Sequence, residues 1–427
     1  MDDATMRSVT ALAEAAAAAS AELALATAEA RNGALQAMAV ALRAEAACIV
    51  EANGRDMEAA RAAGTSEAIL DRLMLDVARV EDMASALEDL MRLPDPLGCV
   101  DMQRELYNGI ELTRVSVPLG VVAVVYEARP NVTADAAGIC LKSGNACILR
   151  GGSLAQHSNE AIARVLADAA VSSGMPHGCI CAITTTDRSA TDALMQLHGL
   201  VDVLIPRGGA GLIRHCIEHS RVPVIETGTG NCHVYVQASA DMAMARDIVV
   251  NAKCRRYGVC NAAETLLVDE PVADELLAQV VPELASRGVV MHADERAREA
   301  ALRAGAPSAL VVAAGEHDWE TEYLAPEIAI KCVSGVTEAV AHINRYGTHH
   351  SEAIVTSDAE AANYFVRAVD AAAVYVNAST AFTDGGQFGL GAEIGISTQK
   401  LHARGPFALD ALTSYKYVLR GDGQVRS

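Results

Sequence analysis

The chain has 427 residues, of which 51% are hydrophobic and 4% aromatic, and its 34 basic and 54 acidic residues give a formal net charge of −20. At roughly 100–200 residues per domain, this length predicts two or three domains. The negative charge, with no local basic patch, excludes nucleic acid and anionic membranes as partners.

The cysteines and the N-terminus favour the cytoplasm. The count of 11 cysteines is odd and lacks framework-like spacing, which indicates reduced thiols rather than disulfides. The first residues are acidic and the alanine-rich run that follows contains glutamates, whereas a signal peptide needs a basic start and an uninterrupted apolar stretch. The most apolar run, residues 115–126, is broken by Pro118 and Gly120 and is shorter than the ~20 residues of a membrane helix.

Helices come first along the chain and strands follow. Residues 5–93 are rich in strong helix formers, with breaks expected near residues 53–54 and 64–66. From Glu111 onward, β-branched runs alternate with helical segments, first to about residue 236 and again between Thr265 and Val376. The strands expected in the first stretch are 120–126, 146–149, 180–183, 201–205, 222–225 and 233–236. This alternation predicts βαβ units and mostly parallel sheets, hence an α/β fold.

Four short segments at expected strand ends carry residues suited to chemistry, and open α/β sheets bind ligands at strand ends. The first segment contains Arg129 and Asn131, whose amide can donate to a developing oxyanion. The second segment contains Arg150, which offers a cation, and Gly151, which permits a close approach by a cofactor.

The third and fourth segments are rich in glycine. The third runs through Arg207, Gly208 and Gly209 and opens an expected helix, whose N-terminus suits an anion or a nicotinamide ring. The fourth places Glu226 on a flexible turn, 34 residues before Cys260.

Cys260 is the most informative single residue. It follows a glycine turn, and Lys253, Arg255 and Arg256 lie just upstream, a setting that favours the thiolate and nucleophilic attack. A free cysteine is more often a small core residue, so the assignment depends on the four segments that accompany it.

In order and spacing these segments resemble the aldehyde dehydrogenase superfamily, in which an Asn and the nucleophilic Cys form an oxyanion hole and a Glu precedes the Cys. The stretch from Glu264 to Val268, and above all a C-terminal block, are similar to the γ-glutamyl phosphate reductase family, from about residue 105 to the end. That block includes Asp384-Gly385-Gly386-Gln387-Phe388-Gly389-Leu390-Gly391-Ala392-Glu393-Ile394-Gly395. The chain departs from the family pattern at Tyr257, where Pro is usual, and at Ala381, where Arg is usual, so a shifted substrate preference stays open.

The resemblance implies NADPH-dependent reduction of γ-glutamyl phosphate to glutamate-5-semialdehyde, a step of proline biosynthesis. It implies that Cys260 forms a thioester, that Asn131 and the Cys260 N–H hold the oxyanion, and that Glu226 acts as a base, tunes the thiol or is structural. Two alternatives stay open: an NAD(P)-dependent dehydrogenase that oxidises an aldehyde to an acid, and a catalytically silent nucleotide-binding oligomer.

The same resemblance implies the binding residues. Those assigned to the cofactor, expected to be NADPH because no acid follows the second strand, are Arg150, Gly151, Arg207, Gly208, Gly209 and Glu322. Those assigned to the substrate are Arg129, Lys253, Arg256 and Glu393. No metal is expected, because the side chains of adjacent His349 and His350 point apart.

The implied architecture is aldehyde dehydrogenase-like, with a Rossmann-type NADP(H)-binding domain at residues 1–102 and 119–228. An α/β catalytic domain follows at residues 229–400, and residues 103–118 and 401–427 form an oligomerisation element. A homodimer or homotetramer is expected, with glutamate 5-kinase as a candidate upstream partner.

Overall fold

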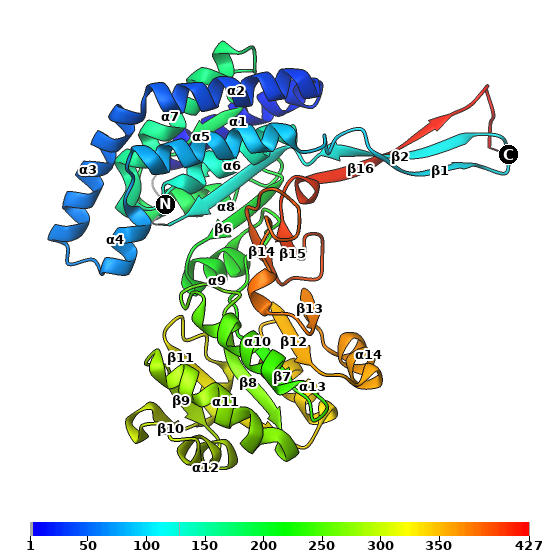
Figure 1. The fold of residues 1–427 in the computed structure, drawn as a ribbon. Helices are drawn as coiled ribbons and strands as arrows, with labels where there is room; N and C mark the ends of the chain where they lie inside the picture. The colour runs from blue at the N-terminus through cyan, green and yellow to red at the C-terminus, as the bar shows by residue number, and fades with distance from the viewer. Residues whose placement is uncertain (1–2, 128, 427) are drawn as a thin grey trace. The chain divides into compact units, whose positions relative to one another are not determined.

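The chain forms two compact units in the computed structural model, which describes residues 3–127 and 129–426. Unit 1 comprises residues 1–227, 390–395 and 407–427, and unit 2 comprises residues 228–389 and 396–406. Each unit is built around its own parallel sheet (Figure 1), which confirms the predicted α/β class.

The N-terminal part of unit 1 is helical. Its helices are α1 (Asp3–Leu23), α2 (Ala28–Ala44), α3 (Ala46–Ala62), α4 (Glu67–Leu73) and α5 (Val77–Arg92). The predicted break near residues 64–66 is confirmed, but the break near 53–54 is wrong, because α3 continues through it. Asn53 is buried, donates to the Leu73 carbonyl at 2.8 Å and accepts from the Leu75 N–H at 2.8 Å. These tertiary contacts outweigh the weak helix propensity of Asn and Gly.

No single helix of the described chain is long and apolar enough to cross a membrane. Helices α2 and α3 meet that criterion only as a pair, bent by 66°. Both helices belong to unit 1, both contact the helix α7 (Gln156–Ser172), and each contributes buried residues to that unit.

The sheet of unit 1 has the order β5-β4-β3-β6, and all of its strands are parallel. The strands are β3 (Val121–Tyr126), β4 (Ala146–Arg150), β5 (Ile180–Ala182) and β6 (Val203–Arg207), and the helices that follow them are α6 (Asn131–Lys142), α7 (Gln156–Ser172), α8 (Arg188–Met195) and α9 (Ala210–His219). Every residue of β3 and β4 is buried, as expected of strands covered on both faces. The connection after β5 reverses direction across the sheet, so α6 and α7 lie on one face and α8, packed against α1, lies on the other.

The strand predicted at residues 222–225 is wrong. Only an isolated bridge joins Val224 to Leu204, beside β6. Pro223 accepts from the Leu204 N–H at 2.8 Å, but its own nitrogen carries no hydrogen, so the ladder cannot continue.

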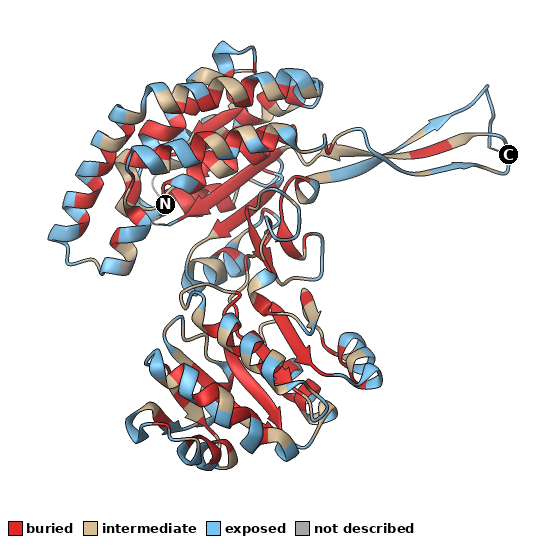
Figure 2. Ribbon diagram, viewed as in Figure 1, coloured by how far each residue is buried: buried red, intermediate tan, exposed pale blue. Residues whose placement is uncertain are grey.

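A three-stranded antiparallel sheet extends from unit 1 as a narrow arm (Figure 1). Its strands are β1 (Val100–Glu105), β2 (Glu111–Pro118) and β16 (Thr413–Arg420), in the order β1-β2-β16. The outer strands β1 and β16 are mostly exposed, whereas the central strand β2 is partly or fully buried (Figure 2). The arm thus pairs the segment just before β3 with the C-terminal strand. Thr113 and Val418, which are neighbours in this pairing, are 305 residues apart in the sequence.

Unit 2 contains a seven-stranded parallel sheet of order β10-β9-β11-β8-β7-β12-β13. Its strands are β7 (Cys232–Val236), β8 (Ala263–Asp269), β9 (Val290–Ala293), β10 (Val311–Ala313), β11 (Glu327–Val333), β12 (Ser351–Val355) and β13 (Ala373–Val376), and its helices are α10 (Met242–Cys254), α11 (Ala273–Ser286), α12 (Glu295–Arg303), α13 (Val336–Tyr346) and α14 (Ala359–Ala368). Helices α10, α11 and α12 enclose one apolar core, and α13 and α14 enclose another on the opposite face. A separate pair, β14 (Gly395–Ser397) and β15 (Gly405–Phe407), lies near the C-terminus.

Candidate active site

Three of the four predicted segments meet at the carboxyl edge of the unit 1 sheet, around Glu127. The Glu127 N–H donates to the Arg207 carbonyl at 3.2 Å, and its carboxylate accepts from the Gly209 N–H at 2.9 Å. A Cβ on Gly208 would lie 2.7 Å from the Glu127 carboxyl carbon, and one on Gly152 would lie 3.1 Å from Glu127 Cα. The glycines therefore permit close packing of the loops. Glu127 cannot be recognised from the sequence, because its contacts depend on β3 and β6 being neighbours.

Asn131 begins α6 and is exposed, directly after the exposed Arg129. Its side-chain amide donates to the Asp135 carboxylate at 3.0 Å, one helical turn later. Burial raises the pKa of Asp135 to about 6, against the opposing effects of Asn131 and Arg207. At neutral pH Asp135 is therefore ionised and fixes one amide hydrogen, and a second hydrogen remains for another acceptor. Sequence analysis missed Asp135, although its spacing of four from Asn131 was a usable signal.

A shallow hollow opens beside the carboxyl ends of β4 and β5. Gly151 lines it, and a Cβ there would lie 2.0 Å from the Asn159 amide nitrogen. That nitrogen is buried and has no hydrogen-bond partner in the described part of the chain. Arg150 donates to the carbonyls of Thr186 at 3.0 Å and Asp187 at 3.3 Å, so its guanidinium fixes the loop after β5. A hollow in this position, at the carboxyl ends of parallel strands and with an unpartnered amide, suits part of a dinucleotide.

Glu226 and Glu393 are both partly buried in unit 1. The hydroxyl of Thr227, next to Glu226, donates to the Pro206 carbonyl at 2.9 Å. A Cβ on Gly395 would lie 2.8 Å from the Thr227 side chain. The segments of the two predicted carboxylates and the end of β6 are therefore neighbours within unit 1.

In unit 2 the predicted residues lie at the amino ends of strands. Cys260 precedes β8, Glu322 precedes β11, and Gly230 precedes β7. Because this sheet is parallel, these ends share one edge. The expectation that the fourth segment follows a strand is wrong, because residues 222–225 form none; its glycines lead into β7 instead.

The loop that carries Cys260 is held through its backbone. Gly230 packs against it so closely that a Cβ on Gly230 would lie 1.6 Å from the Cys260 carbonyl oxygen. The Cys232 thiol donates to that same oxygen at 3.1 Å. The Thr380 hydroxyl donates to the Asn261 carbonyl at 2.8 Å. The partly buried Cys260 therefore lies on a support formed by the start of β7 and by the short 3-10 helix Thr380–Phe382.

The two departures from the family pattern lie in or near this support. Ala381 contacts the loop through its backbone, where its carbonyl accepts from the Asn261 amide at 3.3 Å. This bond does not depend on the side chain, so the support is retained with Ala at this position. Tyr257 packs against the core of unit 2, and its hydroxyl hydrogen-bonds with Cys254.

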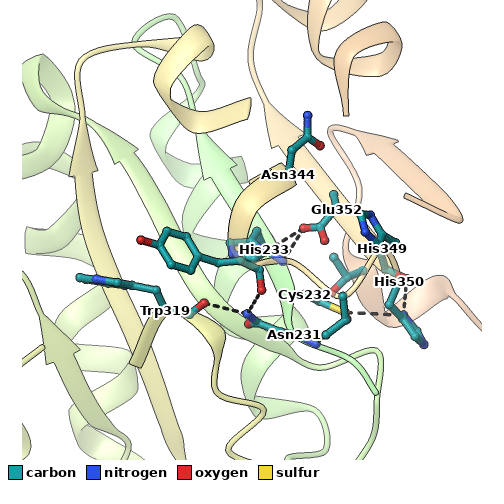
Figure 3. A network of polar contacts seen from close by, with 12 residues as sticks. Asn231, Cys232, His233, Trp319, Asn344, His349, His350 and Glu352 are labelled. Carbon is teal, nitrogen blue, oxygen red and sulfur yellow. Dashed lines mark hydrogen bonds and ion pairs between the residues drawn. The ribbon is translucent and has the colours of Figure 1, made fainter. Parts of the chain in front are cut away.

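A buried polar network lies beneath the start of β7 (Figure 3). The backbone N–H and Nδ1 of His233 lie 2.8 and 3.0 Å from the Glu352 carboxylate, and both side chains are fully buried. Asn231 donates to the Trp319 carbonyl at 2.8 Å. Burial lowers the pKa of His350 to about 4, so this histidine is neutral at pH 7. The network anchors the segment that leads from Gly230 into β7.

Lys253 does not lie on the surface beside Cys260. It is fully buried in α10, and its Nζ lies 2.5 Å from a carboxylate oxygen of Glu264, which is also fully buried. Burial lowers the pKa of Lys253 and raises that of Glu264 to about 7. Of the three basic residues expected to place positive charge near Cys260, Arg255 and Arg256 are exposed and unlike Lys253 are not buried. The role of Glu264 was missed, although the residue belongs to the motif quoted for the resemblance.

Comparison with known proteins places the chain among reductases. Residues 1–304 match the model of the aldehyde dehydrogenase family. A relative from Moorella thermoacetica, named gamma-glutamyl phosphate reductase, is 56% identical over 396 residues, 93% of each chain. A relative of the same name from Thermobifida fusca is 50% identical over 420 residues, 98% of this chain and 99% of that protein.

A solved structure of a protein with the same name is also similar to this chain. The crystal structure of gamma-glutamyl phosphate reductase from Thermotoga maritima is 45% identical, with a TM-score of 0.95, and the match covers 98% of this chain and all of that one. The similarity therefore includes the N-terminal helices, beyond the region from residue 105 in which sequence motifs carried the resemblance.

Proposed function

The chain belongs to the aldehyde dehydrogenase family and, within it, to the γ-glutamyl phosphate reductases, and we propose that it reduces L-glutamate 5-phosphate to L-glutamate 5-semialdehyde with NADPH, releasing phosphate. This reaction serves proline biosynthesis. The observation that carries the proposal is identity of 56% over 93% of the chain to a relative of that name. Cys260, on its supported loop, supplies the nucleophile.

The chemistry follows from the residues of the two units. The Cys260 thiolate attacks the acyl carbon, and the Asn131 amide and the Cys260 N–H donate to the oxyanion that develops. The bond to the phosphate oxygen breaks, phosphate leaves, and a thioester to Cys260 remains. A bound nicotinamide cofactor would supply the hydride that reduces the thioester carbon. The carbon–sulfur bond then breaks and returns Cys260 as a thiolate, with the semialdehyde as product.

A bound dinucleotide would be held by the residues assigned to the cofactor. The hollow beside Gly151 would hold the adenosine half, and the turn at Gly208 and Gly209, with Arg207, would hold the diphosphate. Glu322 would hold the nicotinamide ribose. Aldehyde dehydrogenases use nicotinamide cofactors, and the positive charge of Arg150, without a neighbouring acid in its segment, favours the 2′-phosphate of NADPH.

The substrate carries a phosphate and a carboxylate, and the exposed Arg129 and Arg256 are suited to bind them, with Glu393 facing the amino group. Release of phosphate needs no general base to activate water, so Glu226 instead tunes the reactivity of the Cys260 thiol or stabilises the turn on which Glu226 lies. The reductase must exclude water from the thioester, whereas a hydrolytic dehydrogenase would admit water to hydrolyse it.

The exposed side chains of the arm suit it to an interface between subunits. The arm formed by β1, β2 and β16 exposes Tyr415, Tyr417 and Leu419, each more than half exposed, and these residues become buried when the arm joins subunits in a homodimer or homotetramer. The reaction takes place in the cytoplasm, in keeping with the free cysteines of the described chain. Glutamate 5-kinase, which produces this acyl phosphate, is the upstream partner.

The test runs the reaction in reverse. Glutamate-5-semialdehyde, NADP+ and phosphate are supplied, NADPH is followed by absorbance, and the wild type is compared with Cys260→Ala, with the exposed Cys48→Ala as matched control. We expect turnover that requires phosphate and Cys260, at a wild-type rate in Cys48→Ala. Turnover without phosphate would instead indicate a hydrolytic dehydrogenase with Glu226 as base. NADPH binding with no turnover would indicate the silent oligomer.

A further inference from the structure

The buried ion pair of unit 2 has no place in the mechanism above. Lys253 and Glu264 are fully buried, on α10 and β8, and each is removed from water at a large cost in solvation. A buried ion pair is weak evidence for stability, because apolar residues of the same size often serve as well. The presence of this buried ion pair is explained if its two charges hold a neighbouring segment in one conformation.

The pair is bonded to a strained segment. The second carboxylate oxygen of Glu264 accepts from the Leu324 N–H at 3.3 Å. Leu324 has a φ of 53°, in the left-handed region that a leucine rarely adopts, and its side chain is exposed. No packing of the side chain therefore explains the strain, whereas the bond to Glu264 does.

The same segment carries Glu322, two residues before Leu324. The carboxylate of Glu322 accepts from the Gly230 N–H at 2.7 Å. Gly230 is in turn the residue with no room for a Cβ against the Cys260 carbonyl. A displacement of Glu322 would therefore move Gly230, and through Gly230 it would move the backbone of Cys260.

We propose that Lys253 and Glu264 are positioning residues, which hold Leu324 in its left-handed conformation and so aim Glu322 at the Gly230 backbone beneath Cys260. All six of these residues lie in unit 2. This assignment replaces the earlier expectation that Lys253 binds substrate, and it rests on the proposed function only for its catalytic readout. It also connects the carboxylate assigned to the nicotinamide ribose with the nucleophile itself.

The decisive variants cut the connection at Leu324. Leu324→Pro removes the N–H that Glu264 accepts and fixes φ near −65°, while the ion pair stays intact. Leu324→Gly is the matched control, because it keeps the N–H and adopts a left-handed φ without strain. The double variant K253M/E264L removes both charges together, so neither is left buried without a partner.

Two readouts separate positioning from mere structure. The first is the rate at which iodoacetamide alkylates Cys260, followed on the Cys260 peptide by mass spectrometry, and it needs no substrate or cofactor. The second is kcat and KM in the reverse assay, with thermal unfolding as the check on folding. We expect alkylation and kcat to fall about tenfold or more in Leu324→Pro and in K253M/E264L, because small displacements of a reacting group cost large factors in rate. Leu324→Gly should match the wild type.

The proposal is overturned if Leu324→Pro is folded and alkylates and turns over like the wild type, or if K253M/E264L does so. If K253M/E264L fails to fold, Leu324→Pro and Leu324→Gly decide alone, because Leu324 is a surface residue. A wild type that lacks phosphate-dependent turnover refutes the proposed function, and the alkylation rates still decide this inference.

Discussion

Replacing Gly230 by Ala gives a sharp test of the support beneath Cys260. A Cβ at position 230 would lie 1.6 Å from the carbonyl oxygen of Cys260 and 2.7 Å from its Cα. These are backbone atoms, so no rotation of a side chain relieves the contact. To reach 3.4 Å, the start of ordinary contact, the two segments must separate by about 1.8 Å. Gly230 does not have a left-handed φ, so the contact alone causes the effect.

The displacement should reduce both stability and rate. Overpacking of this kind costs about 1–3 kcal/mol of unfolding free energy. The loss of rate should be larger, because a misplacement of about 1 Å can reduce the rate by about 100-fold. We therefore expect Gly230→Ala to remain folded at 25 °C and to lose at least about 100-fold in kcat, measured in the reverse assay alongside urea unfolding.

The matched control is Gly54→Ala in the interior of α3. A Cβ at position 54 has no heavy atom within 4 Å, so the substitution should stabilise the protein by about 0.5–1 kcal/mol through helix propensity. Its kcat should be that of the wild type. The reasoning fails if Gly230→Ala keeps wild-type kcat, or if both variants shift the unfolding free energy in the same direction by the same amount.

Two further predictions concern unit 1. Burial raises the pKa of Asp135 to about 6, above the ~3.9 of an exposed aspartate, so between these values the folded chain keeps a proton that the unfolded chain has lost. The unfolding free energy should therefore fall as the pH rises through that window, and Asp135→Asn should make this fall smaller than in the wild type in urea series from pH 4 to 8; a fall equal to that of the wild type would contradict the assignment. Arg31 is buried and pairs with Asp95 at 2.8 Å, so Arg31→Met should lower the unfolding free energy by about 2–3 kcal/mol. Arg43→Met, at an exposed pair, should cost far less by urea unfolding, and equal losses would show that burial is not the cause.

Most of the fold is predictable from the sequence where the signal is local. The runs at residues 121–126 and 146–150 are apolar without interruption, and both strands are buried on both faces. The predictions fail where a distant contact or a missing donor overrides a local pattern. Asn53 marks a break in composition but is held inside α3 by Leu73 and Leu75, and Pro223 ends a ladder that the apolar pattern of its neighbours favours.

The chemical residues of the site are predictable in kind, and their supports are not. Cys260 and Asn131 are recognisable as candidates because the proposed reaction needs a thiol and an amide in a fixed order along the chain. Glu127 is not, because its carboxylate matters only once Gly209 has been brought within 2.9 Å by the pairing of two strands. Sequence order specifies reacting groups, whereas supporting contacts depend on which strands become neighbours.

The buried ion pair is an exception, because the sequence did contain its signal. Along α10 the buried positions Ala245 and Val249 are four residues apart, and the next step of four is Lys253, which lies on the same buried face. Glu264 is the second residue of β8, a strand that is buried throughout and has no other charged residue before Asp269. A lone charge in either place is prohibitively costly, so two opposite charges at adjacent elements must pair. Helical and strand periodicity, combined with charge balance, therefore predict a buried pair where the residue types alone had indicated a substrate-binding lysine.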